Sequence, residues 1–247
     1  VEYLDNRDEA KVSYVDVLPN GHIDLEHLEQ LLASTEEKTL VTLMHANNEI
    51  GNITDLFAVG NLCKMYNAIF HSDTVQTMGH YVHDLKNLPV DSIVAGAHKF
   101  HGPKGIGFLY ANKRIKTDVL IHGGAQERGL RGGTENVYGI VGLAKAIELA
   151  YSHLEEHQNH VQGLKTYMID RLRSTLSDVS FHGEIAPEKS LYTVLNVCLP
   201  PTEKSGMLLF TLDLKGVACS GGSACSSGAA KGSHVLEGIQ ADNSRPN

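Results

Sequence analysis

Transmembrane and secretory signals are both missing from this sequence. No apolar run approaches the roughly 20 residues that a helix needs to cross a bilayer. Residues 1–5 show no basic stretch followed by an apolar one, which is the pattern of a secretory signal. We therefore expect a cytoplasmic protein that has no membrane partner.

Positive charge is also scarce. The chain of 247 residues has 21 lysines and arginines against 29 aspartates and glutamates, which gives a formal net charge of -8. Because nucleic-acid-binding surfaces are basic, this balance favours solubility and argues against a nucleic-acid partner. Hydrophobic residues make up 42% and charged residues 20%, as in an ordinary globular protein with one large domain or two small ones.

Cysteine is rare, and no CxxC pair occurs. The chain has four cysteines, Cys63, Cys198, Cys219 and Cys225, which is typical of a reducing compartment. The last two are six residues apart around glycine and serine, which is not a usual zinc spacing, so no metal site is predicted. Cys63 and Cys198 fall on apolar faces and should be buried, whereas Cys219 should be a structural residue at a strand end.

The first half of the chain alternates between strand and helix patterns. Short apolar or alternating runs predict strands, and leucines at helical spacing predict the first helix, while Thr54 is a candidate cap for the second. The predicted strands are 11–17, 40–44, 68–70, 92–95 and 106–111, and the predicted helices are 25–32 and 55–67. This alternation indicates a largely parallel sheet, whose ligands bind at the carboxyl ends of the strands.

The second half is organised differently. Residues 135–176 are predicted to be mostly helical, with a break near Gly163, and a strand at 192–199 and a helix at 205–214 follow. We therefore predict an α/β fold, with a mostly parallel sheet flanked by helices in a large domain at 1–135. A connecting helix and a smaller α+β domain would occupy 136–247. No internal repeat or low-complexity tract is present.

Polar residues follow three of the predicted strands. Asn48, Asp73 and Lys99 each come shortly after such a segment, so a parallel sheet would place them in one pocket. A lysine amine can form a Schiff base with an aldehyde cofactor, and pyridoxal 5'-phosphate (PLP) also needs a carboxylate that faces its ring nitrogen. Asp73 and Lys99 could supply both groups, so the sequence predicts a PLP site.

The chain resembles the cysteine desulfurases, in the class V branch of the aminotransferase superfamily. Five segments carry the resemblance, in family order and across most of the chain. They are 45–51 (HANNEIG), 71–76 (HSDTVQ), 94–105 (VAGAHKFHGPKG), 123–136 (GGAQERGLRGGTEN) and 219–228 (CSGGSACSSG). The resemblance implies the PLP fold type I, a homodimer, and an enzyme that converts L-cysteine to L-alanine and passes on the sulfur.

The resemblance also assigns roles around the cofactor. Lys99 matches the Schiff-base lysine, and His98 matches a histidine that contacts the cofactor and can move protons, which suits an imidazole pKa near 6.5. Asp73 would face the pyridine nitrogen, Gln76 would bond the phenolic oxygen, and Asn48 would approach the same side of the ring.

Two more matched residues lie further along the chain. Thr134, expected to begin a helix, matches a threonine that reaches the cofactor phosphate of the other subunit. Cys225 matches the cysteine that takes up sulfur as a persulfide, and its Gly/Ser-rich surroundings suit a travelling nucleophile. A sulfur-acceptor scaffold protein, delivery to iron–sulfur cluster assembly or thiolation, and a transient iron–sulfur contact at Cys225 are implied.

Plainer interpretations exist for these residues. Asp73 and Thr134 could be helix N-caps, and amides such as those of Gln76 and Asn48 often only satisfy the backbone of a loop. A lysine after a strand can be a solvated one, and a histidine there can be bonded to a carbonyl. The alternatives to a cysteine desulfurase are a selenocysteine lyase on the same scaffold and a non-catalytic fragment or scaffold.

The sequence departs from the family pattern at two positions. Gly96 stands where a serine that bonds the cofactor phosphate is usual, and Ala125 stands where a third glycine is usual. The family's ring-stacking histidine would fall upstream of Val1, and its substrate-carboxylate arginine would fall beyond Asn247, because Arg245 is out of register. These gaps indicate an internal piece of a larger enzyme.

Overall fold

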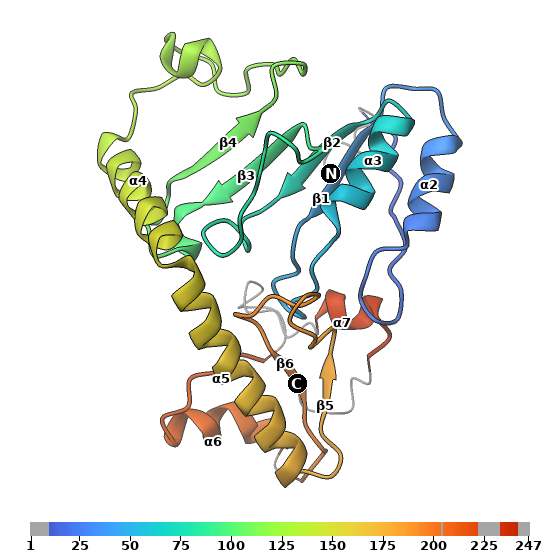
Figure 1. Ribbon diagram of the computed structural model, residues 1–247, viewed down its shortest axis with the longest axis vertical. Helices are drawn as coiled ribbons and strands as arrows, with labels where there is room; N and C mark the ends of the chain where they lie inside the picture. Colours follow the sequence, from blue (N-terminus) through green and yellow to red (C-terminus); the bar gives the residue numbers. More distant parts are fainter. Residues whose placement is uncertain (1–9, 204, 222–232, 242–247) are drawn as a thin grey trace.

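The computed structural model describes residues 10–203, 205–221 and 233–241. Figure 1 shows a sheet in its upper half, with two short helices beside one end and a long pair of helices that descends from the other end. A smaller layer with a two-stranded sheet lies below, beside the lower part of the long helices. The predicted α/β architecture is confirmed.

The main sheet has four strands in the order β1-β2-β3-β4. They are β1 (Leu40–Met44), β2 (Ile69–Asp73), β3 (Ser92–Gly96) and β4 (Gly107–Ala111). The first three are parallel, with Met44 paired to Asp73 and Asp73 paired to Val94, whereas β4 returns antiparallel to β3. The mostly parallel sheet is therefore confirmed, and the tight connection after β3 accounts for the reversal of β4.

Two short helices pack beside β1 and β2. In α2 (Leu25–Ala33) and α3 (Leu56–Met65), an aspartate precedes the first turn and accepts its backbone N–H groups. Asp55 Oδ1 accepts from the amides of Phe57 and Ala58, at 2.9 and 3.0 Å, so the predicted cap at Thr54 is wrong. A cap side chain must reach the second and third helical amides, and Asp55 holds that position.

The core lies between these helices and the sheet. Its largest fully buried side chains include Phe70 on β2, Ile93 on β3 and Phe100 just after β3. Cys63 of α3 is buried in the same cluster, as predicted. Alternate residues of β2 and β3 are buried, so one face of these inner strands contributes to the core.

The long helices are α4 (Val137–Ser152) and α5 (Leu154–Thr175). The break falls at His153, whose φ of -117° and ψ of 17° are not helical, and the predicted break near Gly163 is wrong. A glycine inside a helix costs only about 1 kcal/mol, and buried Lys165 and Ile169 hold this stretch of α5 in place. Among the described residues, no helix is both long and apolar enough to cross a membrane.

The lower layer pairs β5 (Ser180–His182) antiparallel with β6 (Asn196–Cys198). The predicted strand at 192–199 is thus shorter than expected, although Cys198 is buried as predicted. The predicted helix at 205–214 is confirmed as the 3-10 turn η3 (Ser205–Met207) followed by α6 (Leu208–Leu214). Helix α7 (His234–Gly238) comes last, and the division into domains at residue 135 stays a prediction.

The turn at residues 47–53 joins the upper layer, which contains the sheet β1–β4, to the lower layer, which contains β5 and β6. The Gly51 carbonyl accepts from Leu191 N at 2.7 Å, and Asn52 Oδ1 accepts from Glu184 N at 2.7 Å. Asn196 Nδ2 donates to the Glu49 carbonyl at 3.3 Å. Segments far apart in the sequence therefore meet at this turn.

The predicted strand at 11–17 does not form. Only Val17 makes a bridge, with Ile23, across a turn in which Gly21 has a φ of +84°. The alternating pattern is present, but no neighbouring strand pairs with the rest of the segment within the described residues. Alternation indicates a half-buried strand only where a partner exists.

Candidate functional site

The carboxyl ends of β1, β2 and β3 meet at one edge of the sheet. His45 N donates to the Asp73 carbonyl at 2.8 Å, and Thr74 N donates to the Val94 carbonyl at 3.1 Å. Lys99 follows five residues after Val94. The structure therefore places the residues that follow three parallel strands at a common edge, which is where such sheets bind ligands.

Asp73 ends β2 with an exposed side chain. Its Oδ1 accepts from Val75 N at 2.9 Å and starts a turn over 74–77. No α-helix begins there, so the plainer interpretation of Asp73 as a helix cap is wrong. Within the described part of the chain, no other hydrogen bond to this carboxylate is found, so one oxygen remains available to a ligand.

Lys99 ends η1 (Ala97–Lys99), the 3-10 turn after β3. Buried Ala97 and Phe100 anchor this turn in the core, while the side chain of Lys99 is exposed. The Ala97 carbonyl accepts from Phe100 N at 3.1 Å and from Gly102 N at 2.8 Å. These hydrogen bonds and buried side chains fix the backbone around Lys99. Within the described residues, its amine makes no ion pair.

His98 is exposed and lies over Gly96. A β-carbon at residue 96 would be 3.0 Å from Cε1 and 3.2 Å from Nδ1 of His98. The backbone of Gly96 is extended, with a φ of -122°, which any residue can adopt. A larger residue at this position is therefore limited by the space beside His98 and not by the backbone conformation. The departure from serine at Gly96 therefore leaves room for the ring of His98.

The two candidate amides differ in exposure. Gln76 is half-buried on the turn after Asp73, and Asn48 is exposed on the turn after β1. The neighbouring Asn47 supplies the acceptor for that second turn, since its Oδ1 takes Glu49 N at 2.8 Å and Ile50 N at 3.0 Å. The amide of Asn48 is therefore not needed by the turn.

Thr134 does not begin a helix, contrary to the prediction. Helix α4 begins at Val137, and its N-cap is Asn136, whose Oδ1 accepts from Gly139 N at 3.1 Å. Asparagine is at least as good a cap as threonine, and it lies next to the first helical residue. Thr134 itself is exposed.

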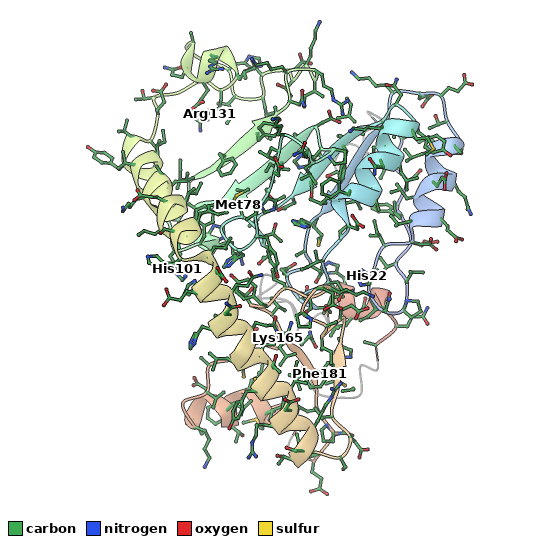
Figure 2. All side chains as sticks on the ribbon, in the orientation of Figure 1. His22, Met78, His101, Arg131, Lys165 and Phe181 are labelled. Carbon is green, nitrogen blue, oxygen red and sulfur yellow. The ribbon has the colours of Figure 1, made fainter. Side chains whose placement is uncertain are left out.

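Arg131, in the segment before α4, and His101, after η1, lie in different parts of the molecule. Figure 2 shows Arg131 at the top of the molecule, beyond the sheet, whereas His101 lies near the lower end of α4. In the segment before α4, the Gly132 amide donates to the Ile121 carbonyl at 2.7 Å, and Ala125 precedes the 3-10 turn η2 (Gln126–Gly129).

The last matched segment contains two cysteines, and the structure describes one of them, Cys219. Cys225 lies outside the described residues. Cys219 is exposed and lies in no strand, so the expectation of a structural cysteine at a strand end is wrong. Among the described residues, no group of three or more metal-ligating side chains is suited to hold an ion.

A half-buried pair of histidines, His45 and His83, lies next to Asp73 and was not predicted. His45 Nδ1 is 2.8 Å from Thr77 Oγ1 and 3.2 Å from His83 Nε2, and the latter is 3.1 Å from the same hydroxyl. Burial, followed by the charge of His83, lowers the pKa of His45 to about 4, and burial also lowers the pKa of His83. Both rings line a cavity of about 1070 Å³. The only sequence signal was the position of His45 directly after a strand.

A second unpredicted group contacts the backbone of Lys99. His80 Nε2 lies 3.0 Å from the Lys99 carbonyl, and His80 Nδ1 lies 2.7 Å from the hydroxyl of Tyr192. Tyr192 is 112 residues from His80 in the sequence, so no local pattern could have paired them.

Comparison with known proteins agrees with this geometry. Residues 1–241 match the family described as Aminotransferase class-V. Cysteine desulfurase IscS of Clostridium botulinum is 41% identical over 229 residues, which are 93% of this chain and 57% of that protein. Cysteine desulfurase IscS of Methanosarcina thermophila is 40% identical over 226 residues, 92% of this chain and 54% of that protein. The chain thus spans less than two thirds of these curated relatives.

Solved structures show the same fold. A NifS-like protein matches with a TM-score of 0.84 and 36% identity, over 98% of this chain and 62% of that chain. A NifS-like protein from Rickettsia africae has a TM-score of 0.84 and 30% identity, over 98% of this chain and 64% of that one. These likenesses confirm the predicted fold type I architecture. The chain belongs to the class V aminotransferase family.

Proposed function

We propose that this chain carries the cofactor-binding core of a PLP-dependent cysteine desulfurase. One observation carries the proposal: Asp73 ends one parallel strand, and Lys99 follows the end of the adjacent strand at the same sheet edge. Relatives named cysteine desulfurase support the substrate, L-cysteine, and the product, L-alanine.

The side chains at this edge fit the cofactor. An exposed amine and a carboxylate with a free oxygen are the two groups that PLP requires, and the same edge also carries an imidazole and two amides. When bound, PLP supplies an aldehyde for the amine and a ring that withdraws electrons from an attached amino acid. Because residue 96 is a glycine, the site lacks one hydroxyl that could donate to the cofactor phosphate. The hydroxyl of Thr74 does not replace it, because it already donates to the Val94 carbonyl at 2.7 Å.

Each residue of the site has a separate task. Lys99 would hold the cofactor, and the carboxylate of Asp73 would accept the hydrogen of the protonated ring nitrogen. Gln76 and Asn48 would orient the ring, while His98, exposed one residue before Lys99, would move protons. These roles come from the family resemblance and are supported by the common edge on which the residues lie.

The sulfur step is assigned to Cys225. Its thiolate attacks the sulfur of the substrate cysteine, so a sulfur–sulfur bond forms and the carbon–sulfur bond breaks. The bonding electrons stay with carbon, which takes up a proton and leaves as alanine. The persulfide would pass to an acceptor protein for iron–sulfur cluster assembly or thiolation, and a reducing cytoplasm would keep the thiol free.

A homodimer with shared sites is part of the proposal. Several large exposed apolar side chains flank Thr134 in the sequence. They are Leu120, Ile121, Leu130, Val137, Tyr138 and Val141. A second copy would cover them and bring Thr134 to its cofactor. Tyr138→Asp should convert the full-length dimer to monomer in analytical ultracentrifugation, and an unchanged dimer would contradict this interface.

The test of the cofactor site is chemical labelling. Full-length protein is incubated with PLP, reduced with borohydride and digested, and the pyridoxyl group should map to Lys99. Lys99→Ala should abolish the yellow colour without loss of the fold, since the side chain is exposed and outside the core. Lys104→Ala, which removes an equally exposed lysine near the same turn, is the matched control. A label on another lysine would refute the site.

A non-catalytic scaffold is the alternative, and one observation favours it. Gly96 lacks the side-chain hydroxyl with which the family's serine would bind the cofactor phosphate. A colourless full-length protein that cannot be labelled with PLP would support this alternative.

A further inference from the structure

His80 connects Lys99 to a residue in the lower layer. Its Nε2 is 3.0 Å from the Lys99 carbonyl, and its Nδ1 is 2.7 Å from the Tyr192 hydroxyl. The rings of His80 and Tyr192 meet edge to face, with centroids 5.5 Å apart. Both nitrogens of one imidazole are thus engaged, each by a group from a different part of the chain.

The partners determine the tautomer of His80. A carbonyl can only accept, so Nε2 must carry the hydrogen and donate it to Lys99. Nδ1 is then the acceptor, and the Tyr192 hydroxyl must donate to it. Burial lowers the pKa of His80, its bond to the Lys99 carbonyl raises it, and the charges of His101, His157 and Lys99 lower it, which favours the neutral ring.

Tyr192 is firmly placed for this task. It is only 3% exposed, and its backbone N lies 3.4 Å from the Tyr81 hydroxyl. Burial, followed by the charge of Tyr81, raises the pKa of Tyr192 to about 12, so its hydroxyl keeps its hydrogen.

Helix α5 fixes the residues that precede Tyr192. Lys165, on the helix as Figure 2 shows, donates from Nζ to Ser190 Oγ at 2.6 Å and to the Leu191 carbonyl at 3.0 Å. Leu191 N also donates to the Gly51 carbonyl at 2.7 Å. The segment that leads to Tyr192 is therefore hydrogen-bonded both to α5 and to the turn at residues 47–53.

The carbonyl of Lys99 needs a hydrogen-bond donor from outside its own turn. Lys99 is the last residue of a three-residue 3-10 turn, and the carbonyls at the end of a helix have no partner within it. A lysine side chain has many rotamers, so the orientation of its backbone limits where its amine can reach.

We propose that His80 and Tyr192 are positioning residues that fix the Lys99 carbonyl and so direct its amine into the cofactor site. The inference rests on the proposed role of Lys99. It assigns no contact between His80 and the cofactor; His80 acts through the backbone of Lys99.

The first test observes the tautomer directly in the cofactor-free, full-length protein. Nitrogen NMR of ¹⁵N-histidine protein should show the His80 ring with a protonated Nε2 and an unprotonated Nδ1, with the signal assigned by its loss in His80→Gln. Tyr192→Phe removes the donor to Nδ1 and should shift the signal toward a mixture of tautomers. A ring with hydrogen on Nδ1 in the wild type would overturn the proposal.

The second test measures how fast Lys99 reacts. PLP is added, samples are reduced with borohydride at intervals, and the label on Lys99 is followed by mass spectrometry. His80→Leu should slow labelling roughly three- to tenfold, as for the loss of one hydrogen bond, and Tyr192→Phe should slow it less. His80→Gln, which retains an N–H near the position of Nε2, should recover most of the rate.

The control is Tyr66→Phe, which removes a tyrosine hydroxyl that bonds to Glu29 and contacts neither His80 nor Tyr192. It should label Lys99 at the wild-type rate. Unchanged labelling in His80→Leu and Tyr192→Phe, with a labelled wild type, would overturn the positioning role alone. A wild type that never labels Lys99 would overturn the proposed cofactor site as well.

Discussion

The ring of His98 lies beside Gly96, and its Cε1 is only 3.0 Å from the position that a β-carbon at residue 96 would take. His98 is exposed, so its ring can move by the few tenths of an ångström that a larger residue requires. The backbone of residue 96 is already suited to any side chain.

Gly96→Ser should therefore be tolerated and should strengthen cofactor binding. An added hydroxyl can donate to the phosphate, and a hydrogen bond to a charged group corresponds to about a tenfold gain in affinity. Equilibrium titration of the full-length protein with PLP measures the effect. Gly96→Ala adds the β-carbon without the hydroxyl and should give no gain; equal gains in both variants would refute the explanation.

Asp73→Asn should lower turnover of cysteine by orders of magnitude in the full-length enzyme while PLP still binds. The amide keeps the acceptor for Val75 N but lacks the charge that holds a proton on the ring nitrogen. Steady-state alanine release and the absorbance of bound cofactor are measured together. Asp84→Asn is the control, because Asp84 accepts a turn amide in the same way at Lys86. Near-normal turnover in Asp73→Asn would leave that residue a purely structural role.

Cys225→Ser should eliminate both persulfide formation and alanine release from cysteine. Incubating the wild-type, full-length enzyme with cysteine should add one sulfur to the peptide that contains Cys225, and a reductant should remove it. Cys219→Ser, which changes an exposed cysteine six residues away, should retain both activities. Extra sulfur on Cys219, or wild-type alanine release by Cys225→Ser, would show that the nucleophile is assigned wrongly.

Stability should fall with acid because of His45. Its pKa is about 4 in the folded protein and 6.5 in the unfolded chain, so the unfolded state binds more protons between these values. The free energy of unfolding should thus be highest above pH 6.5 and drop by up to about 3 kcal/mol as the pH falls to 4.

Urea unfolding at pH 7.5 and pH 5 measures this dependence. His45→Asn keeps a polar atom toward Thr77 but cannot take up a proton, so its stability should change less between the two values. His122→Asn, which replaces an exposed histidine, should follow the wild type. Identical pH dependence in His45→Asn and the wild type would exclude His45 as the cause.

Local patterns in the sequence predicted most of the upper layer. The strand at 40–44 and the helix that begins at Leu25 were correct because an apolar run or a spacing of leucines reflects burial by immediate neighbours. The strand at 11–17 failed for the converse reason, since its pattern was present but its partner was not. The break at His153 was missed because neither this residue nor its neighbours is a glycine or a proline.

The candidate site was predictable as far as strand order allowed. Asn48, Asp73 and Lys99 follow parallel strands, so topology alone brought them to one edge. His80 and Tyr192 could not be found in this way, because their contact joins residues 112 positions apart. Whether the predicted residues bind PLP remains a prediction that the labelling of Lys99 tests.

The turn at 47–53 also has a consequence for the order in which the chain folds. Asn52 and Glu49 bond to partners 132 and 147 residues further along the sequence. Closing loops of this length carries an entropic cost that grows with the logarithm of the loop length, and contacts between residues far apart in the sequence slow folding. The upper sheet, whose strands are close in sequence, should form first, and the lower layer should dock onto this turn in a later, slower kinetic phase.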